Sequence, residues 1–202
     1  MSTKLLIATH NRGKLREYAE LFDGLPLHLL GPDDLGLDLD VQESGATYTD
    51  NARLKAQAYA QAVSLLTLAD DSGLEVDALD DAPGVRSARY APGKDADRVT
   101  ALLHALEQAG ATGEDRAARF RCVIVLMSPD GRAWTTEGTC PGRIIDTPRG
   151  SGGFGYDPIF YLPTHGCTMA ELATEEKNRI SHRARAAQAL RPILAQLAAP
   201  ED

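Results

Sequence analysis

The chain has few cysteines, no long apolar run and no excess of positive charge. The three cysteines Cys122, Cys140 and Cys167 are odd in number and far apart, without a CxxC pair. They indicate reduced thiols rather than a disulfide framework or a zinc site, and we expect a cytoplasmic protein. The apolar run at residues 5–9 is too short for a signal peptide, and none approaches the length of a membrane span. We therefore expect no membrane partner.

The acidic balance of the chain excludes a further class of partner. Its 202 residues include 29 acidic and 21 basic side chains, which gives a net charge of −8. Proteins that bind the nucleic-acid backbone carry clustered Lys and Arg, so we expect no nucleic-acid partner. A small anion would need a local basic pocket or a metal ion. The length and the 43% hydrophobic content predict a single globular domain over residues 1–202.

Predicted strands alternate with predicted helices. Continuous apolar runs predict buried strands at residues 5–9, 27–30 and 65–69. Apolar residues at helical spacing predict helices at residues 11–22, 49–63 and 98–109. A Pro-Asp-Gly turn predicts a hairpin of residues 120–127 and 133–139. A capping box at Thr168 and Glu171 precedes an Ala- and Arg-rich helical region, in which Pro192 is expected to mark a break or a fresh start. This order predicts an α/β domain around a mixed sheet.

Residues 150–158 form the most informative segment of the chain. Four glycines in six residues let the backbone approach a ligand closely, and Phe154, Tyr156 and Asp157 follow almost without a spacer. The segment then runs into the strand-like residues 159–162. Glycine freedom beside an aromatic ring suits the binding of a flat heterocycle. An irregular turn with Phe154 and Tyr156 in the core explains the pattern equally well.

Residues 9–14, Thr-His-Asn-Arg-Gly-Lys, lie where a predicted strand turns into a helix. Free backbone N–H groups at a helix start, a glycine and a lysine can together bind phosphate, although the spacing is not that of a Walker A loop. Taken alone, the motif favours a capped helix with a solvated Lys14. Lys55, on the next predicted helix, likewise favours a solvated helix face, which it shares with Asn51.

Asp70 and Asp71 follow directly on the buried strand at residues 65–69. Neighbouring strand residues point to opposite faces, so the two acids share one site only if the strand ends there. We expect one acid to face a ligand crevice at the carboxyl end of the strand. The other would hold a helix start, a lysine or a metal-bound water. With Glu43, on the loop before the helix at 49–63, a strand-end aspartate would make a Mg²⁺ site.

Residues 175–183 carry the last cluster of charge. On one helix Lys177 and Ser181 share a face, and so do Arg179 and Arg183. If the helix breaks near Ser181, that residue caps a new helix, with His182 and Arg183 at its positive end. A charged amphipathic helix with a structural His182 is the simpler interpretation.

Taken together, these segments resemble the inosine triphosphate pyrophosphatases, also described as dITP/XTP pyrophosphatases, over almost the whole chain. Four blocks match in order, at residues 9–14, 69–74, 152–160 and 180–183. Shorter matches lie at residues 51–56, 83–85 and 87–90. His10 departs from the glycine that many members carry, and Cys140 stands where some relatives have Trp.

The resemblance implies a fold and an activity. The fold is an elongated mixed twisted sheet flanked by helices, with two lobes and a central cleft. The activity is hydrolysis of ITP, dITP or XTP between the α- and β-phosphates to the monophosphate and pyrophosphate, by a Mg²⁺-dependent homodimer. The family's phosphate contacts fall on Thr9, His10, Asn11, Arg12, Gly13, Lys14 and Lys55. Its general base falls on Asp71, which with Glu43 would bind the metal, and Asp70 would assist. Its other substrate contacts fall on Ser72, Phe154, Gly155, Tyr156, Asp157, Lys177, His182 and Arg183.

Within this resemblance, Phe154 would stack on the base, and donors from His182 or Arg183 would satisfy its 6-oxo group and disfavour adenine. Two alternatives stay open. One is a pyrimidine or modified-nucleotide pyrophosphatase of the septum-inhibitor type, whose Ser-x-Ser-Pro-Arg-Arg motif this chain lacks. The other is a nucleotide sensor without catalysis, which would need Phe154 and Lys14 but not Asp71.

Overall fold

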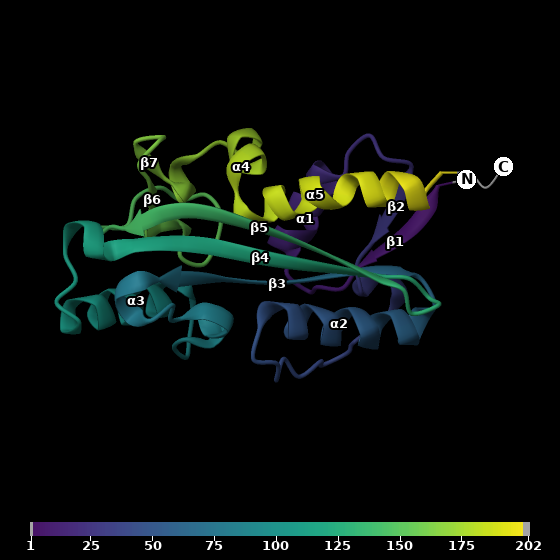
Figure 1. Ribbon diagram of the computed structural model, residues 1–202, viewed down its shortest axis with the longest axis horizontal. Helices are drawn as coiled ribbons and strands as arrows, with labels where there is room; N and C mark the ends of the chain where they lie inside the picture. The colour runs from purple at the N-terminus through teal and green to yellow at the C-terminus, as the bar shows by residue number, and fades with distance from the viewer. Residues whose placement is uncertain (1, 200–202) are drawn as a thin grey trace. The chain divides into compact units, whose positions relative to one another are not determined.

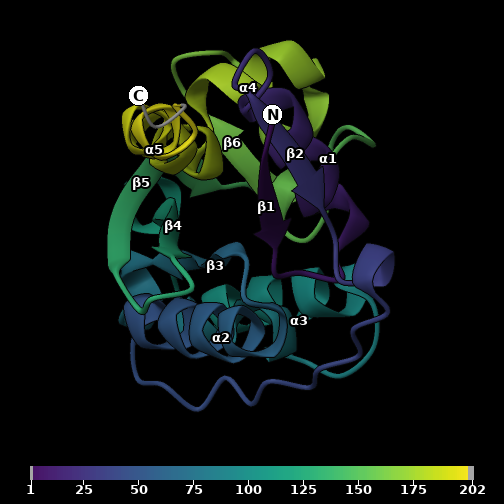
Figure 2. The ribbon, with the colours of Figure 1, turned by 90° about the vertical axis from the view of Figure 1, so that its right-hand side faces the viewer.

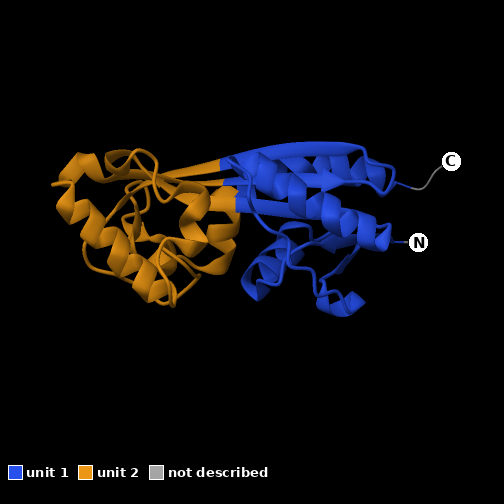
Figure 3. Cartoon of the chain, turned by 90° about the horizontal axis from the view of Figure 1, so that it is seen from below, with its two compact units in different colours: residues 1–71, 122–138, 183–202 blue, residues 72–121, 139–182 orange. Residues whose placement is uncertain are grey.

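The computed structural model describes residues 2–199, which form two compact units (Figure 3). Unit 1 contains the chain up to residue 71, residues 122–138 and the chain from residue 183 on. Unit 2 contains residues 72–121 and 139–182. Three strands run through both units, and the single domain expected over residues 1–202 stays a prediction.

The strands form one mixed sheet, which confirms the predicted fold class (Figure 1). In spatial order its members are β2 (Leu27–Leu30), β1 (Thr3–Ile7), β3 (Leu66–Val76), β4 (Ala117–Met127), β5 (Ala133–Ile144), β6 (Phe160–Leu162) and β7 (Cys167–Thr168). β1 pairs in parallel with β2 and β3, whereas β5, β6 and β7 pair in antiparallel fashion.

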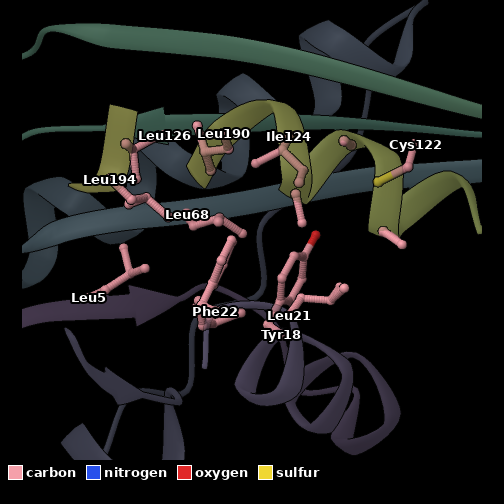
Figure 4. Packing of buried hydrophobic residues seen from close by; sticks show 14 of the residues in the cluster. Leu5, Tyr18, Leu21, Phe22, Leu68, Cys122, Ile124, Leu126, Leu190 and Leu194 are labelled. Carbon is pink, nitrogen blue, oxygen red and sulfur yellow. The ribbon is translucent and has the colours of Figure 1, made fainter. Parts of the chain in front are cut away.

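In unit 1, helices cover both faces of the sheet. Successive strand residues point to opposite faces, so an apolar strand such as β1 has side chains to bury on each face. Leu5 of β1 belongs to a core cluster with α1 (Arg12–Leu21) and α5 (His182–Leu197). Its neighbour Leu6 belongs to a cluster with α2 (Tyr48–Val63). Figure 2 shows α2 on one side of β1 and α1 and α5 on the other. Figure 4 shows Tyr18, Phe22, Leu68 and Leu190 packed in the first cluster.

Unit 2 has a core of its own. Leu74 and Val76 of β3 pack with Leu102 and Leu106 of α3 (Asp95–Gln108), and with Phe160 of β6. The glycine-rich segment leads into a short 3-10 turn, Asp157–Ile159, at the edge of this core. α4 (Thr174–Ile180) completes the unit.

The structure corrects three expectations about element boundaries. β3 does not end at residue 69 but continues through both aspartates to Val76, because the whole segment except Ser72 is buried in the sheet. Pro192 lies inside α5 and neither breaks nor starts a helix. Buried contacts of Leu190 and Leu194 on either side of it stabilise the helix there despite the missing N–H. The capping box at Thr168 and Glu171 caps a 3-10 turn rather than a helix.

Two further observations concern helix length and the cysteines. No helix within residues 2–199 is long and apolar enough to span a membrane. The three cysteines carry free thiols.

Candidate active site

The turn before α1 is a capped helix start, as predicted. Asn11 is the N-cap, and its Oδ1 accepts hydrogen bonds from Gly13 N at 2.8 Å and Lys14 N at 3.2 Å. Lys14, however, is not solvated: its side chain is 14% exposed, and Nζ lies 2.9 Å from Asp70 Oδ2. Burial of the lysine beside a carboxylate therefore overturns that part of the interpretation, and it leaves Arg12 as the exposed cation of the turn.

Thr9 and His10, which belong to the same turn, each form a hydrogen bond through the side chain. Thr9 Oγ1 accepts a hydrogen bond from Asn11 N at 3.2 Å. His10 Nε2 lies 3.1 Å from the hydroxyl of Tyr59 on α2. The turn is thus tied to α2 through His10 and is braced internally by Thr9.

Asp70 is the centre of a buried ion-pair network in unit 1. Besides Lys14, it binds Arg183, whose Nη2 lies 3.3 Å from Asp70 Oδ2, and Arg183 also pairs with Glu17. Burial alone would raise the pKa of Asp70, but Lys14, Arg183 and Lys55 together hold it well below its ordinary value. Asp70 is therefore ionised near neutral pH. Its chemistry suits the anchoring of Lys14 and not proton transfer near neutral pH.

Asp71 points away from that network, as alternation along β3 requires. Its Oδ2 accepts a hydrogen bond from Asn51 Nδ2 at 2.9 Å, and Asn51 Oδ1 accepts one from Gly45 N at 2.8 Å. Burial raises the pKa of Asp71, and the negative charge of Glu43 adds to the effect, while Lys55 and Asn51 oppose it. A carboxylate with a raised pKa is a better proton acceptor than an ordinary aspartate.

Lys55 joins the loop before α2 to strand β3. Its Nζ lies 2.5 Å from Glu43 Oε1 and donates to the carbonyl oxygen of Asp70 at 2.6 Å. Burial lowers the pKa of Lys55, but Asp70 and Glu43 outweigh that effect and raise it. The side chain is 15% exposed, so the expected solvated helix face is wrong.

Glu43 and Asp71 fit a Mg²⁺ ion by their chemistry. Both are carboxylates, the donors that this cation prefers, and Glu43 is close enough to raise the pKa of Asp71. Within residues 2–199 no group of three or more His, Cys, Asp or Glu side chains converges as a metal site. Mg²⁺ commonly uses one or two carboxylates and keeps its waters, which agrees with such a sparse donor set.

The two aromatic residues of the glycine-rich segment in unit 2 have different surroundings. Tyr156 is buried, and its hydroxyl donates to Ser87 O at 3.0 Å, so it is a core residue. Phe154 is only half-buried, and Lys177 Nζ lies 5.1 Å from its ring centroid. Of the two interpretations of this segment, the core applies to Tyr156 and not to the half-buried Phe154.

Asp157 fixes the backbone of Phe154 and the side chain of Lys177. Its Oδ2 accepts hydrogen bonds from Phe154 N at 3.0 Å and from Lys177 Nζ at 2.9 Å. A Cβ on Gly153, where φ is +72°, would lie 2.0 Å from the same oxygen. Only glycine therefore fits at position 153.

The residues around the break between α4 and α5 are also buried. α4 ends at Ile180 and α5 begins at His182, so the helix breaks at Ser181 as considered above. The His182 ring stacks on Phe120 with centroids 4.8 Å apart. Arg183 is 1% exposed and pairs with Asp70 and Glu17 in unit 1.

The structure thus groups the predicted residues by unit. Unit 1 brings together Lys14, Glu43, Lys55, Asp71 and Arg183, and unit 2 brings together Phe154, Gly155, Asp157 and Lys177. Ser72 is the first residue of unit 2, half-buried in β3. Sequence reasoning missed Glu17 as the partner of Arg183 and Asn51 as the partner of Asp71. Nothing in the sequence pairs residues 166 positions apart, as Glu17 and Arg183 are.

Known proteins resemble this chain over nearly its full length. The model of the Ham1 family matches residues 5–193. The dITP/XTP pyrophosphatase of Geobacter sulfurreducens is 48% identical, covering 95% of this chain and 96% of the relative. That of Thermus thermophilus is 49% identical, covering 93% and 89%. Among solved structures, a HAM1 protein from Coxiella burnetii has a TM-score of 0.87 at 42% identity, covering 96% of this chain and 99% of its own.

Proposed function

The chain belongs to the Ham1 family, and from this premise we propose that it hydrolyses non-standard purine nucleoside triphosphates to the monophosphate and pyrophosphate. The names of its relatives support the reaction and the substrate class. One feature of the chain itself carries the proposal furthest: the buried Asp71, held by Asn51 beside Glu43 and Lys55. These groups are those that water activation at a phosphoanhydride requires.

Each group of unit 1 has a distinct proposed role. Asp71 accepts a proton from the attacking water, a role supported by its burial and its hydrogen bond from Asn51. Glu43 and Asp71 would hold Mg²⁺, which when bound neutralises phosphate charge and makes water more acidic. Lys14 and Lys55 supply positive charge for the phosphates, which a chain of net charge −8 must provide locally. The backbone N–H groups of His10 and Arg12 would support the same anion, because those of Thr9, Asn11, Gly13 and Lys14 already donate within the turn.

The residues of unit 2 are proposed to bind the base. Phe154 stacks on the purine, while Asp157 holds the Phe154 backbone and Lys177 lies over the ring. His182 is proposed to donate to the 6-oxo group of the base. Adenine carries a donor there and would leave the site's polar groups unpaired, which can cost it roughly 10⁴-fold.

Three finer points belong to the same proposal. We propose a Mg²⁺ requirement, supported by the Glu43 and Asp71 carboxylates. We also propose a location in the cytoplasm, which the free thiols support, and a homodimer, which rests on the family resemblance.

Pyrophosphate release across a nucleotide panel tests the substrate class. With Mg²⁺ present, we expect ITP, dITP and XTP to be hydrolysed with kcat/KM at least about 10²-fold above that for ATP, since a misplaced polar group on the base costs at least that much. A preference for dTTP or UTP would favour the pyrimidine pyrophosphatase instead. Binding of ITP without pyrophosphate release would favour the sensor.

The pH profile of an Asn51 variant tests the role of Asp71. The Asn51 amide stabilises the ionised carboxylate, so Asn51→Ala should raise the pKa of Asp71 further. We therefore expect the acid limb of kcat/KM for ITP to move to a pH about one unit higher, as loss of one charge-assisted hydrogen bond implies. Gln57→Ala, an exposed change on the same helix, is the control. An unmoved acid limb in Asn51→Ala contradicts the assignment of Asp71 as the base.

A further inference from the structure

Carboxylates from two different places hold consecutive amides of the glycine loop, residues 150–158. Asp157, within the loop, accepts the N–H of Phe154 at 3.0 Å. Asp95, the first residue of α3 and 60 positions away in sequence, accepts the N–H of Gly155 at 2.7 Å. The peptide units on both sides of the Phe154 side chain are therefore fixed by charge-assisted hydrogen bonds.

Gly155 depends on this hydrogen bond for its conformation. Its φ is +62°, in the left-handed region, and a Cβ added there would have no neighbour within 4 Å. Glycine has more conformational freedom than any other residue, so the hydrogen bond to Asp95 is a restraint that this residue cannot supply with a side chain of its own. Gly153, on the other side of Phe154, also has positive φ but is confined by Asp157. Without Asp95, the peptide unit between Phe154 and Gly155 would therefore be less restrained than the one between Gly153 and Phe154.

Asp95 is itself held in place. Its Oδ1 pairs with Arg98 on the next part of α3, and Arg98 Nη1 also donates to Gly93 O at 3.0 Å. Burial raises the pKa of Asp95, but the Gly155 amide and Arg98 outweigh it and lower the pKa. The carboxylate is thus ionised, with one oxygen bound to Arg98 and the other to Gly155.

We infer that Asp95 is a positioning residue that preorganises the Phe154 ring for stacking on the substrate base by holding the Gly155 amide. The inference rests on the proposed function, because it gives Phe154 the base of the proposed substrate as its ligand. Asp95 itself touches neither the base nor the phosphates in this account. A preorganised ring binds the ground state and the transition state alike, so its loss weakens binding without slowing the chemical step.

Steady-state kinetics of three variants test this role. We expect Asp95→Ala to raise KM for ITP about tenfold and to leave kcat within about twofold, as lost uniform binding does. Asp95→Asn keeps an acceptor oxygen in the same place and should recover most of the loss. Asp97→Ala is the matched control, since Asp97 lies in the same helical turn but binds Lys94 N, at 2.7 Å. Inhibition by inorganic tripolyphosphate, which has no base, should be the same in all three variants and the wild type.

Amide hydrogen exchange of Gly155, followed by NMR, gives a readout that needs no activity. The exchange should be at least about tenfold faster in Asp95→Ala and unchanged in Asp97→Ala, because only the first variant loses the acceptor. Unchanged exchange in Asp95→Ala overturns the inference, and so does an equal rise of KM in Asp97→Ala or weaker inhibition by tripolyphosphate. A wild type that does not hydrolyse ITP overturns the proposed function, and the exchange of Gly155 then still decides whether Asp95 holds the loop.

Discussion

Asp71→Asn is expected to lower kcat for ITP hydrolysis by at least about 10³-fold while the protein still binds ITP. A general base contributes roughly 10²–10⁴-fold, and the same change weakens the proposed Mg²⁺ site. The asparagine keeps the size of the side chain and an oxygen that can accept from Asn51 Nδ2, so the surroundings should persist. Pyrophosphate release under single-turnover conditions measures the chemical step, and calorimetry measures ITP binding.

Asp38→Asn is the matched control for this prediction. Asp38 is an exposed acid of unit 1, and its substitution removes the same charge from the protein. It should leave kcat unchanged within about twofold, because an exposed charge is screened by solvent. An Asp71→Asn protein that releases pyrophosphate within tenfold of the wild-type rate would show that another group activates the water.

Asp70→Asn is expected to destabilise the protein by about 3–5 kcal/mol, the usual effect of removing one partner from a buried ion pair. Asp70 is 1% exposed and binds both Lys14 and Arg183. Without its charge, Arg183 loses one of the two carboxylates that it pairs with here, keeping Glu17, and Lys14 loses the carboxylate of Asp70. Urea unfolding at neutral pH measures the difference.

The adjacent Asp71→Asn supplies a control on the same strand. Burial raises the pKa of Asp71, so its charge already opposes folding, and a neutral side chain should change stability by less than about 1 kcal/mol or increase it. Equal destabilisation by the two variants would contradict the division of β3 into an anchoring acid and a reactive acid.

The pH dependence of stability should follow from the same ion pairs. The pKa of Asp70 is lowered in the folded protein, so its contribution is fully present above the ordinary value of 3.8 and is lost as pH falls below it. Asp70→Asn should therefore remove part of the acid sensitivity that the wild type shows below pH 3.8. A variant that loses stability on acidification as steeply as the wild type would place the sensitive group elsewhere.

Local patterns in the sequence were sufficient to predict most elements. Asn11 after a buried run identified the N-cap of α1, because its side chain can satisfy the free N–H groups. Alternation of Leu5 and Leu6 between two core clusters follows from the period of a strand with helices on both faces. These features depend on neighbouring residues alone, so they can be predicted without the tertiary structure.

The two aspartates show why the candidate site was harder to predict. A pair of acids after a buried run resembles the end of a strand, since burying a carboxylate is costly. β3 nevertheless continues through Asp70, because Lys14 and Arg183 offset the charge of that carboxylate. Arg183 lies 113 positions from Asp70 in the sequence. Sequence alone could not reveal these partners. It likewise could not distinguish Tyr156, whose hydroxyl reaches Ser87 O, from the half-buried Phe154.

The products formed from ITP by the wild-type protein test the central claim most directly. Incubation with ITP and Mg²⁺, followed by separation of the nucleotides and quantification of both phosphate species, should give one IMP and one pyrophosphate for each ITP consumed. Hydrolysis should cease when the metal is chelated. Formation of IDP with orthophosphate, or no conversion of ITP at all, would contradict the account.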